Sequence, residues 1–221
     1  MEKAYDAKAW GSGALRLAIA FNTSGMDQNQ AYTLLDQGYL TDVQKIDFSI
    51  QGLGTNEAML EKTLKGKTAA EIQVIREAWE KQHPNEKFND RILEETGIWG
   101  YRGGREKFDT QLLLEGEPVT LQEKLAREQK RIQYELDTET PDGHALAGAE
   151  RNAMLAELKD LEEAYNKLSD PKTTADQKAL LYGQFERRQE GVQAGVSAYR
   201  TQVDALADTA SNIAGAVVAV A

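Results

Sequence analysis

Two short segments hold the residues whose types and spacing could do chemistry in this chain. One is the run Gly52–Thr55, which reads Gly-Leu-Gly-Thr, and the other is the run Glu94–Gly97, which reads Glu-Glu-Thr-Gly. Glycines allow a backbone to turn its carbonyl oxygens outward into a concave cluster, and such oxygens suit a hard cation such as Ca²⁺. Because carbonyl oxygens leave the positive charge uncompensated, we expect a carboxylate from the second segment, Glu94 or Glu95, to complete the site.

Such a site would leave coordination positions open to water or to the phosphate oxygens of a lipid. The metal would then bridge an acidic protein and an acidic membrane, which otherwise repel each other. The alternative is structural, because a Gly-x-Gly run between two helices also serves as a simple connector. The residues alone leave both interpretations open.

Other catalytic signals are weak. The run Gly66–Thr68 contains the end of a phosphate-binding loop, but Glu61 occupies the position of the first glycine, so the loop cannot wrap phosphate oxygens. The run Asp137–Gly143 resembles part of a calcium loop, but its glycine comes one place late and the distal Glu is missing. With only His83 and His144, no Ser-His-Asp arrangement stands out from chance. We therefore expect no enzymatic activity.

The composition excludes several classes of function. Of the 221 residues, 41% are hydrophobic, which is enough for a sizeable core. The formal net charge of −10 argues against nucleic acid as a partner, because phosphate binding needs a concentrated positive surface. The lack of cysteine excludes disulfides and thiolate zinc sites. The start, Met1–Asp6, has no apolar core, so no secretory signal is predicted and the localisation stays unknown.

Apolar residues recur at helical spacing between residues 42 and 115, which predicts five short helices that pack against one another. The expected core residues are Val43, Ile46, Ile50, Met59, Leu60, Thr63, Leu64, Ile72, Ile75, Ala78, Trp79, Phe88, Ile92, Phe108, Leu112 and Leu113. Thr55 is expected to cap the helix after the glycine run, and Thr68 with Glu71 forms a predicted capping box. Since no stretch alternates with period two, the predicted class is all-α.

Residues 1–41 are expected to form an N-terminal helical segment that echoes the region after residue 42. A shift of 29 residues aligns Gly25 with Gly54, so that Phe21 matches Ile50. This segment is either a degenerate half-repeat or a chance match between apolar helices.

The C-terminal half has a different sequence pattern, in which longer helices are expected. Residues 116–142 are expected to form a connecting helix, opened by a capping box at Thr120, and a linker. Residues 143–221 predict a long antiparallel helical hairpin with a break at Asp170-Pro171, and exposed heptad stripes on it would allow self-association. The apolar run Ile213–Ala221 is too short to span a bilayer, so either it packs on the protein or a longer segment has been cut.

The residues around the glycine run are similar to one annexin repeat. The matching run is Ile50-Gln51-Gly52-Leu53-Gly54-Thr55-Asn56-Glu57, followed by helices and then by Glu94-Glu95-Thr96-Gly97. The resemblance covers residues 42–115 and implies a five-helix repeat followed by the helical hairpin. The calcium ligands that it implies are Gln51, Gly52, Gly54 and Glu94.

Two departures separate this sequence from animal and plant annexins, which carry four repeats. Asn56 stands where an acidic residue usually follows the loop threonine, and a helical hairpin after the repeat is not an annexin feature. The order is similar instead to annexin-like segments of large bacterial secreted or polymorphic toxins. This resemblance implies a non-catalytic structural or delivery module of a larger polypeptide. The alternative that it implies is calcium-dependent binding of an anionic phospholipid membrane through the Gly52–Thr55 loop and Glu94.

Overall fold

The described residues form helices and no strands, which confirms the predicted all-α class. A computed structural model describes residues 6, 13–51, 55–97, 100–137 and 148–218. It divides the chain into two compact units, Met1–Glu117 and Pro118–Ala221, and each unit is described by itself.

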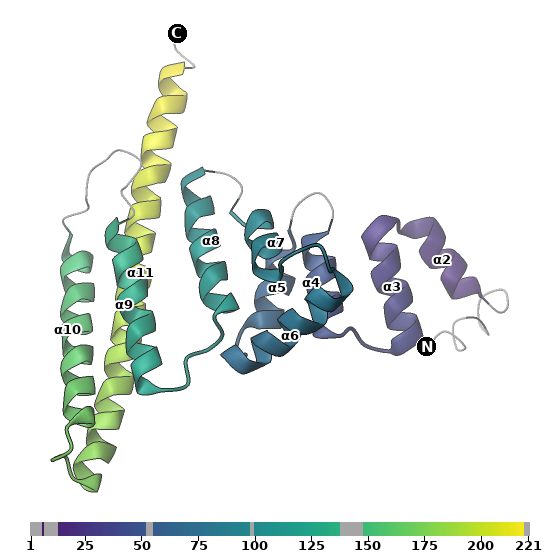
Figure 1. Cartoon of the computed structure of the whole chain (residues 1–221). Coiled ribbons are helices and arrows are strands. Elements are labelled where there is room, and N and C mark those ends of the chain that lie inside the picture. The colour runs from purple at the N-terminus through teal and green to yellow at the C-terminus, as the bar shows by residue number, and fades with distance from the viewer. Residues whose placement is uncertain (1–5, 7–12, 52–54, 98–99, 138–147, 219–221) are drawn as a thin grey trace. The chain divides into compact units, whose positions relative to one another are not determined.

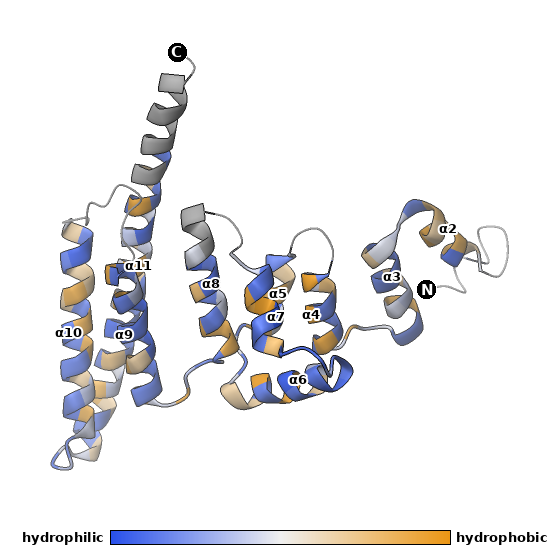
Figure 2. Cartoon of the chain, turned by 45° about the horizontal axis from the view of Figure 1, so that its top comes forward, coloured by the Kyte–Doolittle hydropathy of each residue, from blue (hydrophilic) through white to orange (hydrophobic). Residues whose placement is uncertain are grey.

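The first unit contains a helical hairpin followed by five short helices (Figure 1). Its helices are α2 (Ala14–Asn22), α3 (Gly25–Gln37), α4 (Asp42–Ile50), α5 (Glu57–Leu64), α6 (Ala69–Gln82), α7 (Phe88–Glu95) and α8 (Gly100–Leu114). Helix α6 runs crosswise to α4 and α5 in both Figure 1 and Figure 2.

One hydrophobic core joins helices α4 to α8, because each helix is too short to be stable alone. Its buried members are Val43, Ile46, Ile50, Leu60, Leu64, Ile72, Ile75, Trp79, Phe88, Ile92 and Leu114. All of these except Leu114 were predicted from the helical spacing. Phe108 and Leu112 on α8 are buried as well, so the predicted apolar stripes face inward on all five helices.

The connection between α5 and α6 is held by two local devices. Gly66 has a left-handed φ of 78°, and the predicted capping box closes between Thr68 and Glu71. The backbone N–H of Thr68 donates to the Glu71 carboxylate and lowers the pKa of that group. The end of α8 then returns to this turn, where the Glu117 N–H donates to the Lys67 carbonyl at 2.6 Å. A strand-like bridge between Thr68 and Glu117 thus closes the five-helix unit.

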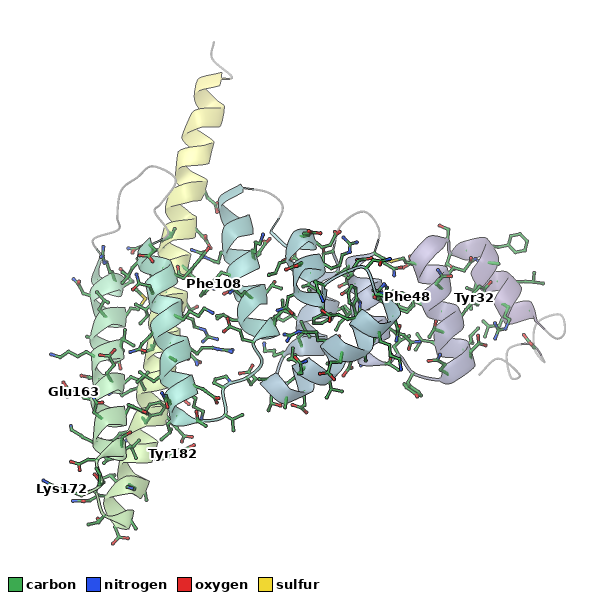
Figure 3. All side chains as sticks on the ribbon, viewed as in Figure 1. Tyr32, Phe48, Phe108, Glu163, Lys172 and Tyr182 are labelled. Carbon is green, nitrogen blue, oxygen red and sulfur yellow. The ribbon has the colours of Figure 1, made fainter. Side chains whose placement is uncertain are left out.

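Helices α2 and α3 form a separate hairpin joined by polar contacts. Arg16 forms an ion pair with Asp36 and lies over the ring of Tyr32, 5.6 Å from its centroid. The Tyr32 hydroxyl donates to the Arg16 carbonyl at 3.2 Å, so Tyr32 fixes α3 beside α2 (Figure 3). No residue of either helix is buried.

The second unit is a bundle of α9 (Leu121–Asp137), α10 (Ala149–Ser169) and α11 (Ala175–Val218). Helix α10 ends at the predicted Asp170-Pro171 break. The sequence predicted a two-helix hairpin here, with α9 as a connecting helix. In the structure α9 packs against both α10 and α11, because Leu125 and Ile132 bury one of its faces even though most of the helix is hydrophilic (Figure 2).

Candidate functional site

The ends of the two predicted loops meet in the first unit. The Thr55 hydroxyl donates a hydrogen bond to the backbone carbonyl of Glu95 at 2.7 Å. A backbone hydrogen bond also joins the residues before and after the glycines, because the Asn56 N–H donates to the Ser49 carbonyl at 2.7 Å. Thr55 and Asn56 are therefore held both at the C-terminus of α7 and at the end of α4.

The predicted calcium ligands fall in different places relative to this contact. Gln51 is exposed directly after α4, and Glu94 is exposed near the end of α7. Gly52 and Gly54 lie outside the described residues. The structure therefore places Thr55, which follows the glycines, next to the Glu94–Gly97 segment. The glycine carbonyls themselves lie outside the described residues.

The two neighbouring carboxylates of α7 differ in their surroundings. Arg91, one turn earlier, forms an ion pair with Glu95 and also reaches Glu86 at 3.4 Å. The charge of Glu95 is thereby largely compensated. The side chain of Glu94 makes no hydrogen bond or ion pair with any described residue and is exposed, so of the two candidates it is the one available to a cation.

The loop threonine has a different role from the predicted one. Thr55 does not cap α5, because the Asn56 side chain accepts a hydrogen bond from the Met59 N–H at 3.0 Å and fills the capping position. The Thr55 hydroxyl is used instead for the contact with Glu95. At the second segment, Gly97 has a left-handed φ of 68°, so the glycine there follows from the way in which α7 ends.

No group of three or more His, Asp or Glu side chains that could hold a metal ion occurs among the described residues. A calcium site of the predicted type would therefore depend on the glycine loop, which lies outside them. Within the same ranges, no helix combines the length and the apolar character needed to cross a membrane.

The side chains of Asp47, Trp79 and His83 meet at the edge of the core of helices α4 to α8. Asp47 accepts a hydrogen bond from Trp79 Nε1 at 2.6 Å and lies 3.1 Å from His83 Nε2. The His83 ring stacks on Trp79, with 4.2 Å between ring centroids. Since Trp79 is buried and its N–H needs an acceptor, this cluster is explained by packing.

Two carboxylates that were not singled out in the sequence are buried in the second unit. Glu128 and Glu135 of α9 are 1% and 2% exposed. Glu128 accepts hydrogen bonds from the side-chain amides of Gln189 and Gln193 at 3.1 and 2.9 Å and from Arg131 at 3.3 Å. Glu135 pairs with Arg200 at 2.5 Å. The sequence contained a pattern that could have predicted their burial, because both glutamates continue the three- and four-residue steps of the apolar seam of α9.

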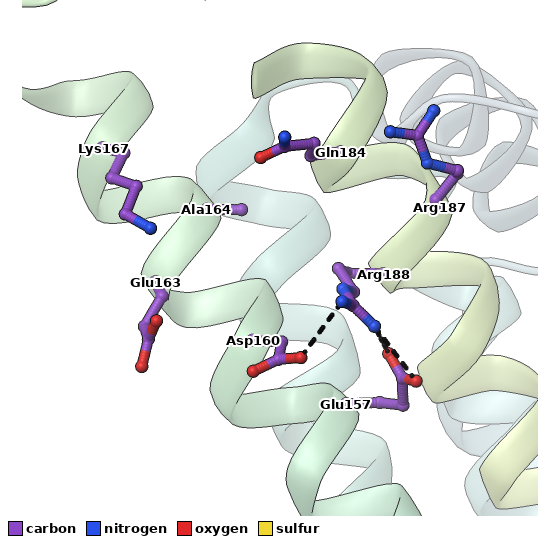
Figure 4. Close-up of a pocket in the computed structure, with 8 residues that line it drawn as sticks. All are labelled: Glu157, Asp160, Glu163, Ala164, Lys167, Gln184, Arg187 and Arg188. Atoms are coloured by element: carbon purple, nitrogen blue, oxygen red, sulfur yellow. Dashed lines mark hydrogen bonds and ion pairs between the residues drawn. The ribbon is translucent and has the colours of Figure 1, made fainter. Parts of the chain in front are cut away.

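A charged groove of about 510 Å³ lies between α10 and α11 (Figure 4). Arg188 crosses it, with 3.1 Å to Glu157 and 3.3 Å to Asp160. Gly191 allows the close approach, because a Cβ at this position would lie 2.7 Å from a Glu157 carboxylate oxygen. The opposite charges in the groove compensate each other and join the two helices.

No family model, curated protein or solved structure matches this chain. The similarity to an annexin repeat therefore rests on the residues quoted above.

Proposed function

We propose that the chain is a non-catalytic structural or delivery module, built around an annexin-like repeat at residues 42–115, within a larger secreted or toxin-like bacterial protein. The helix order supports the repeat, because α4 to α8 are five short helices around one core and α6 crosses its neighbours. The secreted or toxin-like setting comes from the resemblance in the order of repeat and long helices.

The observation that carries the structural role is the contact of the buried Glu128 with Gln189 and Gln193. A polar residue at a core position of a helical bundle favours one register, because a shift separates the Glu128 carboxylate from both glutamine amides and leaves it only Arg131 of its own helix. The second unit is therefore expected to behave as a rigid spacer with one defined arrangement.

The test compares two fragments of the second unit by thermal unfolding. Residues 118–221 are expected to melt cooperatively, whereas residues 143–221 lack α9 and leave both glutamine amides without their acceptor. The shorter fragment should therefore melt at a lower temperature and with a broader transition. If residues 118–221 melt without a cooperative transition, a rigid structural module is the wrong description of this unit.

Calcium-dependent binding to anionic phospholipid is the second candidate, favoured by the hydrogen bond between Thr55 and the Glu95 carbonyl. This bond supports a common edge for the glycine loop and the exposed Glu94, as an annexin-type site requires. One such site would hold a membrane weakly, since strong attachment usually needs several sites.

Calorimetry of the full chain with CaCl₂ tests this candidate. Binding is expected in the micromolar to millimolar range, and Glu94→Gln should abolish it. Asp90→Asn is the matched control, because Asp90 is also an exposed acid of α7. Sedimentation with phosphatidylserine vesicles, with and without calcium, then tests whether the bound ion leads to lipid. Wild-type protein that gives no heat at millimolar calcium would exclude the metal site.

A further inference from the structure

Helix α9 enters the bundle of the second unit with a partly charged face. Its buried residues are Leu125, Glu128, Ile132 and Glu135, so half of its buried positions hold carboxylates. The described buried residues of α10 and α11 are Met154, Leu161, Ala164, Leu168, Phe185, Val192, Val196, Tyr199 and Val203, and none of them carries a charge. Helix α9 is therefore the helix of this bundle whose docking depends most on polar contacts.

The partners of the two carboxylates lie on α11, within reach of water. Glu128 accepts hydrogen bonds from Gln189, which is half-buried, and from Gln193, which is exposed. Glu135 pairs with Arg200, whose side chain is 20% exposed. Water can replace such hydrogen bonds when α9 leaves, so they contribute little net free energy to its docking.

Release of α9 also returns its carboxylates to water. A carboxylate loses its hydration when it is buried, and this cost is recovered as the helix leaves. The free energy that opposes release comes mainly from Leu125 and Ile132 and from the apolar surface under them.

Separation of α10 from α11 gains no such compensation, because none of their described buried residues is charged. The two helices also approach closely, since a Cβ on Gly195 would lie 3.2 Å from the Cα of Met154. The contact between α10 and α11 is therefore expected to outlast the docking of α9.

We propose that α9 is a releasable strap, which leaves α10 and α11 in a minor state of the protein while those two helices stay folded against each other. Proteins open in cooperative units at free energies below that of global unfolding, and elements with few buried apolar contacts open first. In the docked state Glu128 still favours one register. The inference rests on the contacts of the second unit alone and goes beyond the structural role proposed above.

The place of α9 in the chain gives its release a consequence. Helix α9 begins just after Glu117, where the first unit ends, and is 17 residues long. A helix of this length spans about 25 Å. Release would lengthen the covalent connection between the first unit and α10 by up to about that distance. The chain can then extend without the unfolding of the first unit or of the α10–α11 pair.

Hydrogen exchange of the full chain, followed amide by amide in NMR spectra at low urea concentrations, tests the proposal. Amides in the middle of α9 are expected to exchange at least about tenfold faster than those in the middle of α10. Their exchange should also depend less steeply on urea, because release exposes less surface than unfolding of the bundle. Equal rates with equal urea dependence would mean that α9 opens only when the bundle unfolds, which overturns the proposal.

Two charge variants of α11 separate release from other openings. Arg200→Ala removes the arginine that pairs with the buried Glu135 and should speed the exchange of α9 at least about fivefold. Arg188→Glu is the matched control, because Arg188 pairs with Glu157 and Asp160 of α10. The added acid should speed the exchange of α10 and leave that of α9 within about twofold of the wild type.

Two outcomes of these variants would overturn the proposal. If Arg188→Glu speeds the exchange of α9 as much as that of α10, then α9 opens only together with the α10–α11 pair. If Arg200→Ala leaves the exchange of α9 unchanged, then α9 frays without leaving α11.

Discussion

The Cα of Gly116 faces the backbone of Ala69 so closely that a Cβ on Gly116 would lie 2.3 Å from the Ala69 nitrogen. Gly116 also has a left-handed φ of 79°. The contact lies where the chain leaving α8 returns to the start of α6, so it joins the last helix of the five-helix unit to its middle. Neither the helical spacing nor the capping signals of the sequence identify this contact.

Gly116→Ala is therefore expected to destabilise the first unit by more than about 3 kcal/mol, because backbone atoms cannot move aside as a side chain can. Gly66→Ala is the matched control. Gly66 has nearly the same φ, 78°, but no atom within 4 Å of the added Cβ, so only the conformational cost of roughly 1–2 kcal/mol applies. Urea unfolding measures both variants. Equal losses would mean that the close approach to Ala69 contributes nothing.

The hydrogen bond from Thr55 to the Glu95 carbonyl gives a second prediction. Thr55→Val keeps the shape of the side chain but removes the donor, so the free energy of unfolding should fall by about 1 kcal/mol. Thr55→Ser keeps the hydroxyl and should retain most of that stability. Urea unfolding monitored by tryptophan fluorescence provides the measurement. A Thr55→Val variant as stable as the wild type would show that this bond does not join the two loops in solution.

Helical spacing was sufficient to predict the five helices and nearly all of their core, because the apolar residues of each helix from α4 to α8 lie on one face, and that face is buried. Thr68 and Glu71 were also predictable, since a capping box is local in sequence. The role of Thr55 was not predictable, because both Thr55 and Asn56 can cap α5 and the choice depends on Glu95, forty residues away. Only a tertiary contact distinguishes them.

The spacing of Glu128 and Glu135 continues the apolar seam of α9, but the charged composition of this helix argues against their burial. A charged helix such as α9 usually faces solvent, and the sequence identified Leu125 and Ile132 on it but took it as a connector. Carboxylates enter a core only where other helices supply donors, and Gln189 and Gln193 lie about sixty residues further along the chain. The candidate calcium site stays a prediction, because its glycines lie outside the described residues.

The pH dependence of the first unit should depend partly on Asp42. Burial raises the pKa of this carboxyl, but hydrogen bonds from Lys45 and Lys67, each at 2.8 Å, outweigh it and hold the pKa below its usual value of 3.8. A lowered folded-state pKa means that the contribution is complete above the usual pKa and is lost as the pH falls through the folded-state value.

Asp42→Asn should therefore lower the urea midpoint at pH 7, and its difference from wild type should shrink as the pH falls below 3.8 and through the lowered folded-state pKa. Glu106→Gln is the control and should stay close to the wild type across this range, because Glu106 is exposed in the middle of α8, away from the helix ends. The measurement is a series of urea midpoints between neutral and acid pH. An Asp42→Asn variant whose deficit is the same at both ends would rule out the charge of Asp42 as the cause.

The buried Glu128 gives the sharpest prediction for the second unit. Glu128→Ala should destabilise the bundle by about 1–2 kcal/mol, since it empties a buried position and removes the acceptor that the half-buried Gln189 and the exposed Gln193 share. Gln129→Ala removes an exposed hydrogen bond from the same helix and should cost at most about 0.5 kcal/mol.

Replacing Glu128, Gln189 and Gln193 together by leucine removes the donors along with the acceptor. Leucines at Glu128 and Gln189 then fill the space between the helices, and stability should return close to the wild-type value. The fixed register should be lost at the same time, because leucines pack in several registers. Urea unfolding measures the first effect, and broader amide resonances in NMR spectra of the triple variant measure the second. A triple variant as unstable as Glu128→Ala, with sharp resonances, would show that the carboxylate does more than set the register.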